Sequence, residues 1–289
     1  MVADFIGLNS AYKNFLQELK VEGRSPSTIL AYGCDLKQFI KFLADRGKVN
    51  PDQVSLEDLK DFKESLKKDG YTLKSVSRKI NSLRTFFRFL SSKELIKENL
   101  ALRLSHPKVQ VKPPRILSKT EYRALRDACR GDLRISAIVE LLLQTGLRVS
   151  ELANLNTSDL DHNFLNVSVS GKNSSREIPL NRAAKIAVEN YLKVRPETKN
   201  KALFVTKKGT SFLIRNIRTS IDRYFKEAGI KDAKLNDLRH TFIVQQLRAG
   251  IPLTTVSELV GHKRITTTEK YLQFTKLLNT NTKIRLKEL

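Results

Sequence analysis

Apolar residues recur at helical spacing along most of the first hundred residues. Four stripes of this kind follow one another between residues 9 and 104, and three begin at residues that favour helix starts. These starts are Ser25 with Pro26, Ser55, and Thr72, from which the fourth stripe runs to about Leu90. The pattern predicts a small unit built only from helices.

The second half of the chain combines helical stripes with one short stretch of strict alternation. Ser118 followed by Glu121 is a capping-box pattern and predicts a helix start. Residues 164–169 alternate as a strand does, and residues 176–179 give a shorter partner after a turn. The fold class is therefore mainly α, with an α-rich second domain that contains a small antiparallel β-sheet.

The stretch from 105 to 117 separates these two patterns. It contains three prolines and three basic residues and has little apolar periodicity, which is typical of an extended linker. We place an N-terminal helical domain at 1–107, the linker at 108–117 and a second domain at 118–289. The linker's cations could follow a nucleic-acid backbone, or the linker could be a plain spacer.

Composition changes this picture by adding a large positive charge. The formal net charge of the 289 residues is +23, and a polyanion is the simplest partner for such a surface. Nucleic acid is favoured over an anionic membrane. The N-terminus lacks a signal-peptide pattern, and no run of about 20 apolar residues could span a membrane. We expect a cytoplasmic protein.

Basic residues gather on the fourth predicted helix, at positions between its apolar residues. They are Lys74, Arg78, Lys79, Arg84 and Arg88. Such cations could contact DNA phosphates, and a solvated helix face is the alternative.

A group of candidate catalytic side chains lies between residues 236 and 271. Arg239 and His240 fall in a predicted helix, while His262 and Tyr271 follow nine residues apart with a turn expected between them. Arginine offers a cationic fork to phosphate, histidine a neutral donor and tyrosine a nucleophile. This combination predicts attack by Tyr271 on phosphorus.

The surroundings of Tyr271 also suggest how its phenol could be activated. Thr266 and Glu269 form a capping-box pattern, so we expect a helix to start there with Tyr271 in its early turns. The positive end of a helix would ease ionisation of the phenol.

Two further cations are candidates for the same site. Gly146 interrupts an apolar helix and presents Arg148 from a buried corner, where a salt bridge to Glu151 is the alternative role. Lys172 lies at the tip of the predicted hairpin, where most lysines only keep a surface soluble.

These stretches together resemble the signature of the tyrosine recombinases, the Xer, Cre and phage-integrase family. The matching runs are TGLRVSEL at 145–152, LRHTF at 238–242, VGH at 260–262, and TT at 267–268 ahead of Tyr271. The resemblance implies a SAM-like core-binding domain at the N-terminus and a catalytic domain after it. It also implies that the C-terminal tail, 276–289, docks on a neighbouring subunit.

The resemblance assigns a role to each candidate residue. Arg148, Arg239 and His262 would hold the scissile phosphate, and Lys172 would protonate the leaving 5′-oxygen. Glu151 and His240 would support this group. The residue at 236 departs from the family pattern, which has histidine there. Asn236 can bind a phosphate oxygen but cannot exchange a proton near neutral pH, so the proton of Tyr271 must pass to another group or to water.

The predicted function is site-specific DNA recombination through a 3′-phosphotyrosyl intermediate, for integration, excision or chromosome-dimer resolution. Neither a metal nor ATP is implied, because the covalent bond retains the phosphodiester energy. The expected partners are double-stranded DNA and either identical subunits, as a tetramer on paired sites, or a related recombinase subunit. Two alternatives are a type IB topoisomerase, which uses similar chemistry for relaxation, and a non-catalytic architectural protein, which would not need Tyr271.

Overall fold

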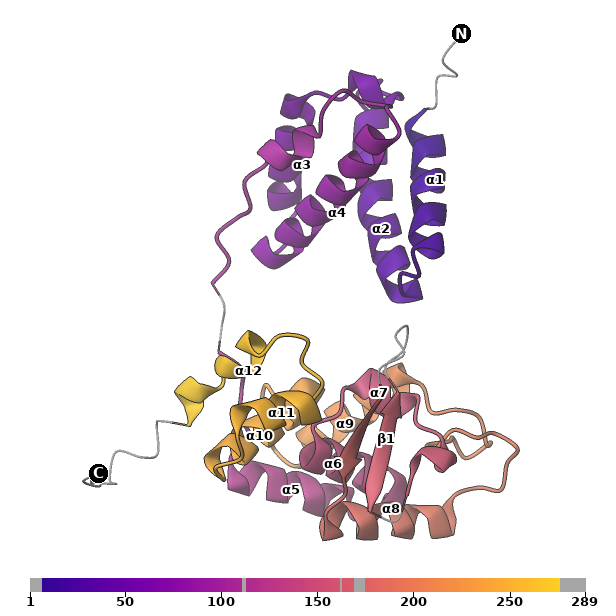
Figure 1. Ribbon diagram of the computed structural model, residues 1–289, viewed down its shortest axis with the longest axis vertical. Helices are drawn as coiled ribbons and strands as arrows, with labels where there is room; N and C mark the ends of the chain where they lie inside the picture. The colour runs from indigo at the N-terminus through magenta and orange to yellow at the C-terminus, as the bar shows by residue number, and fades with distance from the viewer. Residues whose placement is uncertain (1–6, 111–112, 162, 169–174, 276–289) are drawn as a thin grey trace, which may run out of the picture. The chain divides into compact units, whose positions relative to one another are not determined.

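The chain folds as two compact units, Met1–Lys112 and Pro113–Leu289, each with its own hydrophobic core (Figure 1). The structure is a computed structural model and describes residues 7–110, 113–161, 163–168 and 175–275. The predicted tail at 276–289 lies outside the described residues. Among the residues described, no helix is both long and apolar enough to cross a membrane.

The first unit is made of helices, as predicted. Its elements are α1 (Leu8–Val21), α2 (Pro26–Ala44), η1 (Pro51–Gln53), α3 (Leu56–Lys68), α4 (Leu73–Ser92) and η2 (Leu100–Arg103). The side chains of Ser25, Ser55 and Thr72 each accept a hydrogen bond from the backbone N–H three residues later. These bonds satisfy donors that a helix start leaves free, and they confirm all three predicted starts.

Aromatic side chains fill the core of this unit. Phe15 of α1 packs edge to face against Phe86 of α4, with ring centroids 5.4 Å apart, and Phe39 of α2 packs against Phe62 of α3 at 5.0 Å. All four rings are buried. Because each pair joins different helices, the core fixes how the helices of this unit pack together.

The second unit is also mostly helical. Its elements are α5 (Lys119–Cys129), α6 (Leu133–Thr145), α7 (Val149–Ala153), η3 (Thr157–Asp159), β1 (Phe164–Ser168), β2 (Ser175–Pro179), α8 (Arg182–Val194), α9 (Ile214–Glu227), α10 (Leu235–Arg248), α11 (Leu253–Leu259), α12 (Thr266–Glu269) and η4 (Leu272–Phe274). Most of α6 is buried, and it packs against α5, α8, α9 and α10. It is therefore the central helix of this unit.

The two strands form the predicted antiparallel pair. Phe164 is opposite Pro179 and Ser168 is opposite Ser175. Leu165 and Val167 of β1 and Ile178 of β2 are buried, while their neighbours along the strands are more exposed. The alternation seen in the sequence thus separates a core face from an outer face.

Candidate active site

The end of α11 is where the predicted site assembles. Three successive backbone carbonyl groups there accept hydrogen bonds from three arginines of different elements. The pairs are Leu259 with Arg176 at 2.8 Å, Val260 with Arg239 at 2.7 Å and Gly261 with Arg148 at 2.7 Å. The last carbonyl groups of a helix have no partner within it, so cations are favoured at this position.

Arg239 is the most deeply buried of these arginines and lies on α10. Its side chain also donates to the carbonyl of Gly146, the residue that ends α6. Burial lowers the pKa of Arg239 to about 10, and repulsion from Arg148 acts in the same direction. The group still carries its charge at neutral pH, held rigidly between two backbone segments.

Gly146 makes this arrangement possible through its backbone. It adopts a φ of +62°, and a Cβ there would lie 2.4 Å from the ring of Phe242 on α10. Any larger residue would be strained and would clash with that ring. Gly146 therefore lets α6 end close to α10, where its carbonyl meets Arg239.

Arg148 and Glu151 are paired, as the sequence suggested. Nη1 of Arg148 lies 2.8 Å from Oε1 of Glu151, and the backbone N–H of Arg148 donates to Oε2 at 2.8 Å. The side chain of Arg148 nevertheless remains 40% exposed. A cation that is oriented by a buried acid and still open to solvent can bind an incoming anion, so the salt bridge and the predicted phosphate role are compatible.

Arg176 is a member of the cluster that the sequence pattern did not single out. It comes from β2 and donates twice to Glu151, at 3.1 and 2.9 Å, while its Nε binds the carbonyl of Leu259. One signal was available in the sequence. Arg176 lies two residues before Ile178, so a strand places both on the core face, where a cation needs a partner.

Glu151 thus serves two arginines at once. Burial acts to raise the pKa of its carboxyl, but the hydrogen bonds from Arg176 and from the backbone N–H of Arg148 outweigh that effect and lower it. The group is a carboxylate at neutral pH. Three guanidinium groups around one carboxylate leave an excess of positive charge suited to a phosphodiester.

Tyr271 is buried beside this cluster. Its Oη lies 2.7 Å from Nδ1 of His240, and its ring lies 6.4 Å from the ring of His262 at an interplanar angle of 15°. Burial raises the pKa of the phenol, and the charge of Arg239 partly opposes this.

A helix does begin at Thr266, as predicted, but the expected side-chain cap and the expected place of Tyr271 are wrong. Helix α12 has only four residues, its N-cap is Ile265, and no side chain caps it. Tyr271 follows the end of α12 instead of lying in its first turns. Tyr271 is instead the N-cap of the three-residue η4, and burial raises the pKa of its phenol.

His262 is held as a neutral residue. Its Nδ1 lies 2.7 Å from Oγ1 of the buried Thr268, which leaves Nε2 for a substrate. Burial lowers its pKa to about 4, and repulsion from Arg239 and Arg148 contributes. This agrees with the neutral donor expected at this position.

Asn236 and Lys172 are the remaining two residues of the predicted site. Asn236 is exposed in the first turn of α10, and His240 lies four residues later, which puts the two on one face of the helix. Lys172 lies outside the described residues. The two strands whose connection contains it are β1 and β2, and β2 also carries Arg176.

The five basic residues predicted to contact DNA have different environments. Lys79 departs from the prediction because its side chain is buried and donates to Asp35 at 2.9 Å and to Gln38 at 2.7 Å. Arg84 donates to three backbone carbonyl groups near η2. Lys79 is buried and Arg84 is half-buried, and a cation in such a position is retained only when it has partners.

The other three cations are exposed on α4. We call Lys74, Arg78 and Arg88 the α4 cation face. Arg78 also pairs with Asp35, yet its side chain remains 51% exposed. These three residues are the most exposed of the predicted DNA contacts.

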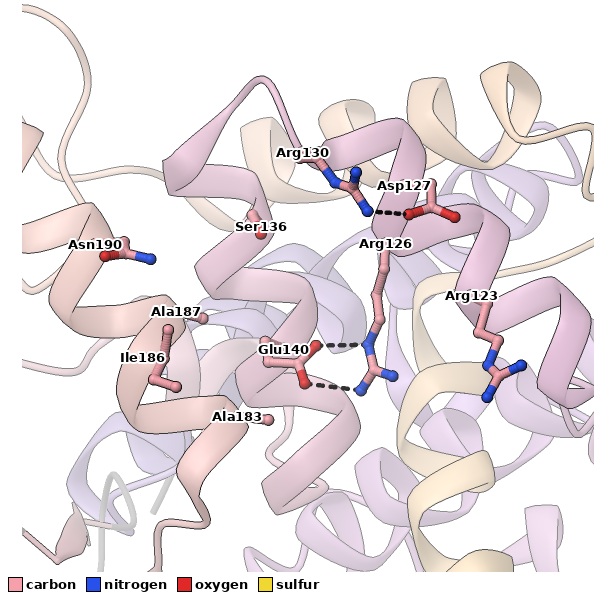
Figure 2. Close-up of a pocket in the computed structure, with 10 residues that line it drawn as sticks. All are labelled: Arg123, Arg126, Asp127, Arg130, Ser136, Glu140, Ala183, Ile186, Ala187 and Asn190. Atoms are coloured by element: carbon pink, nitrogen blue, oxygen red, sulfur yellow. Dashed lines mark hydrogen bonds and ion pairs between the residues drawn. The ribbon is translucent and has the colours of Figure 1, made fainter.

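A separate hollow on the second unit does not have the chemistry of the site above. It lies between α5, α6 and α8, and Figure 2 shows Arg126 reaching across it to Glu140 and Arg130 turned toward Asp127. Two of its three arginines are therefore already paired. No tyrosine or histidine is among the described residues that line it.

Comparison with known proteins gives matches over both units of the chain. The profile of the Phage integrase family matches residues 115–277, and that of the phage integrase N-terminal SAM-like domain matches residues 12–94. The tyrosine recombinase XerC of Roseiflexus castenholzii is 32% identical over 278 residues, covering 91% of this chain and 88% of the relative. The tyrosine recombinase XerD of Oceanobacillus iheyensis is 33% identical over 282 residues, covering 93% and 95%.

A solved structure shares the fold at lower identity. The crystal structure of a lambda integrase tetramer bound to a Holliday junction superimposes with a TM-score of 0.74. The identity is 18%, and the match covers 90% of this chain and 79% of the other.

Proposed function

The chain belongs to the phage integrase family of tyrosine recombinases, and on that premise we propose that Tyr271 cleaves and rejoins double-stranded DNA. The protein is a tyrosine-type site-specific recombinase. The observation that carries the assignment of the nucleophile is the burial of Tyr271, with its ring 6.4 Å from the ring of His262 and its phenol under the influence of the charge of Arg239. Because the substrate is DNA, we place the reaction in the cytoplasm.

The cleavage step follows from this arrangement. Oη of Tyr271 attacks the scissile phosphorus, the bond from phosphorus to the 5′-oxygen breaks, and a 3′-phosphotyrosyl link results. Arg148, Arg239 and His262 stabilise the charge that builds up on the non-bridging oxygens. Asn236 adds a neutral hydrogen bond to the phosphate, and Lys172 gives the leaving 5′-oxygen its proton.

Glu151 contributes by orientation. It holds Arg148 and, with it, Arg176, and both guanidinium groups bind the end of α11 from which His262 follows. The carboxylate thus fixes the positions of two cations and one neutral donor relative to one another before DNA binds. Such preorganisation lowers the cost of stabilising charge at the moment of reaction.

The N-terminal unit has a separate role. We assign residues 1–107 as the core-binding domain, with the α4 cation face on DNA phosphates and residues 108–117 as the linker. Strand exchange needs two cleaved duplexes, so we propose a tetramer on paired sites, formed by identical or related subunits. The lambda integrase tetramer on a Holliday junction supports this assembly.

The test begins with finding the DNA site. Fragmented DNA of the source organism is incubated with the protein, covalent adducts are captured and sequenced, and the recovered site is rebuilt as a nicked suicide duplex. Tyr271→Phe should abolish the adduct and leave DNA binding intact. Tyr224→Phe is the matched control, since Tyr224 is a buried tyrosine of the same unit. An adduct with the Tyr271→Phe variant would assign the nucleophile elsewhere.

A further inference from the structure

We propose that His240 is the catalytic base of this recombinase, accepting the proton of Tyr271 during cleavage and returning it during rejoining. The inference rests on the proposed function and adds a catalytic residue to it. It also names the proton acceptor that Asn236 cannot be.

Geometry provides the first support. Nδ1 of His240 lies 2.7 Å from Oη of Tyr271, within the distance of a direct proton transfer. The two rings are 5.7 Å apart between centroids, and the phenol is 7% exposed. Among the residues that the structure describes, His240 is the hydrogen-bond partner of this oxygen, so bulk water is a poorer competitor for its proton.

The electrostatic surroundings of His240 suit a base. Burial lowers its pKa, Arg239 lowers it further, and Asp237 acts to raise it. The imidazole is therefore neutral at pH 7, with a nitrogen lone pair able to accept a proton. Asp237, on the same helix, favours the imidazolium once it forms.

The second histidine beside the phenol is less suited to this task. Nδ1 of His262 is engaged by Thr268, and the pKa of His262 falls to about 4 because burial and the charges of Arg239 and Arg148 oppose its cation. A group that resists protonation this strongly is a poor acceptor and a good neutral donor. His240 is thus the base, and His262 is the neutral hydrogen-bond donor to the phosphate.

Asn236 explains why this division would arise here. It occupies the position where the family has a histidine, and its amide cannot take a proton near neutral pH. His240 lies one turn later on the same face of α10 and already reaches the phenol. The helix therefore presents a titratable ring at the next position along that face.

Atoms and protons balance in both directions of the reaction. In cleavage, the bond from Oη to phosphorus forms, the bond from phosphorus to the 5′-oxygen breaks, and the phenolic proton moves to Nδ1 of His240. The leaving 5′-oxygen receives a different proton, from Lys172. In rejoining, the 5′-hydroxyl attacks phosphorus and gives its proton back to Lys172, Oη of Tyr271 leaves, and His240 returns its proton to Oη.

The test measures single-turnover cleavage of the suicide duplex from pH 5 to 10. Removing a general base typically slows a reaction by about 10²–10⁴-fold, so His240→Asn should slow cleavage to that extent at pH 7. The parent rate should rise as His240 loses its proton and then level off. The His240→Asn rate should instead keep rising toward the phenol's pKa, because hydroxide then removes the phenolic proton and the ionised phenol is the nucleophile.

Two controls separate a base from a structural residue. Imidazole added to His240→Ala should restore part of the rate, and both variants should bind the duplex as the parent does. A substrate with sulfur in place of the 5′-oxygen needs no acid for its leaving group. If His240 is the base, the His240 variants should cleave this substrate as slowly, relative to the parent, as they cleave the ordinary duplex.

Several outcomes would overturn the proposal. One is a His240→Asn rate within threefold of the parent with the same pH profile. Others are absence of imidazole rescue in a variant that binds DNA normally, or full rescue by the sulfur substrate, which would put His240 on the leaving-group side. Failure of the parent itself to form an adduct would instead reject the proposed function.

Discussion

Glu151 is the residue whose loss should disturb the site most without removing a group that touches DNA. Its carboxylate accepts hydrogen bonds from both Arg148 and Arg176, and it is buried. In Glu151→Gln the shape is kept and the charge is lost. Two guanidinium groups would then face each other across a neutral amide, and Arg176, 13% exposed, would be left as an uncompensated buried cation.

The expected loss of stability can be worked from this burial. Breaking a buried ion pair by removing one partner typically costs about 3–5 kcal/mol. Arg148 is 40% exposed, so solvent screens its share, and we expect a fall of about 3 kcal/mol in the free energy of unfolding. In a unit of this size, each kcal/mol lost from the free energy of unfolding lowers Tm by about 2–4 °C, so we expect Tm to fall by about 6–12 °C.

The assay is thermal unfolding followed by circular dichroism. Glu98→Gln is the matched control, because Glu98 pairs with Arg103 at 2.9 Å but both side chains are more than half exposed. That change should cost less than about 1 kcal/mol. In the double variant Glu151→Gln with Arg176→Met the loss of stability should be smaller than the sum of the two single losses, because removing Arg176 takes away the buried cation.

The pH dependence has a definite sign. Because the pKa of Glu151 is lowered in the folded protein, its contribution to stability is complete above the pKa of the unfolded chain, about 4.3. It is lost as pH falls through the lower, folded pKa. The difference between parent and Glu151→Gln should therefore be constant from pH 6 to 8 and shrink in acid. A destabilisation below about 1 kcal/mol at pH 7, or one equal to that of Glu98→Gln, would refute the reasoning.

Three further predictions concern other parts of the molecule. Neutralising the α4 cation face should flatten the log-log dependence of DNA affinity on salt concentration, by about 0.9 in slope for each phosphate that the variant no longer neutralises. Binding titrations at several salt concentrations measure this slope. An unchanged slope would mean that this face does not touch DNA. Gly261→Ala should cost about 1–2 kcal/mol in unfolding experiments and slow cleavage, because Gly261 has a φ of +65° and a Cβ would lie 2.8 Å from Nη1 of Arg176. Lys172→Ala should cleave the ordinary duplex slowly and the 5′-sulfur duplex near the parent rate, since a thiol leaves without help; equal defects on both substrates would remove Lys172 as the acid.

Much of the fold could be predicted because its signals are local. A serine or threonine that caps a helix does so within three residues, and strand alternation is set by the pleat, so the helix starts at Ser25, Ser55 and Thr72 and the two strands are confirmed. The family resemblance is likewise confirmed, since it depends on contiguous runs of residues.

The contacts that complete the site could not be predicted, because they join segments far apart in the chain. The pairing of Arg176 with Glu151 spans 25 positions, and that of Lys79 with Asp35 spans 44. The 2.7 Å contact of His240 with Tyr271 spans 31. The capping pattern at Thr266 predicted the helix but neither its cap nor its length. The helix begins at Thr266, but no side chain caps it and it ends at Glu269, before Tyr271.

The most direct test of the central claim is to identify the residue joined to DNA. The parent protein is trapped on the suicide duplex, digested with protease and nuclease, and the peptide that carries the nucleotide is sequenced by mass spectrometry. We predict a 3′-phosphate ester on Tyr271, with a free 5′-hydroxyl on the released strand. Linkage through another residue, or a 5′-phosphate ester, would contradict the assignment of Tyr271 as the nucleophile.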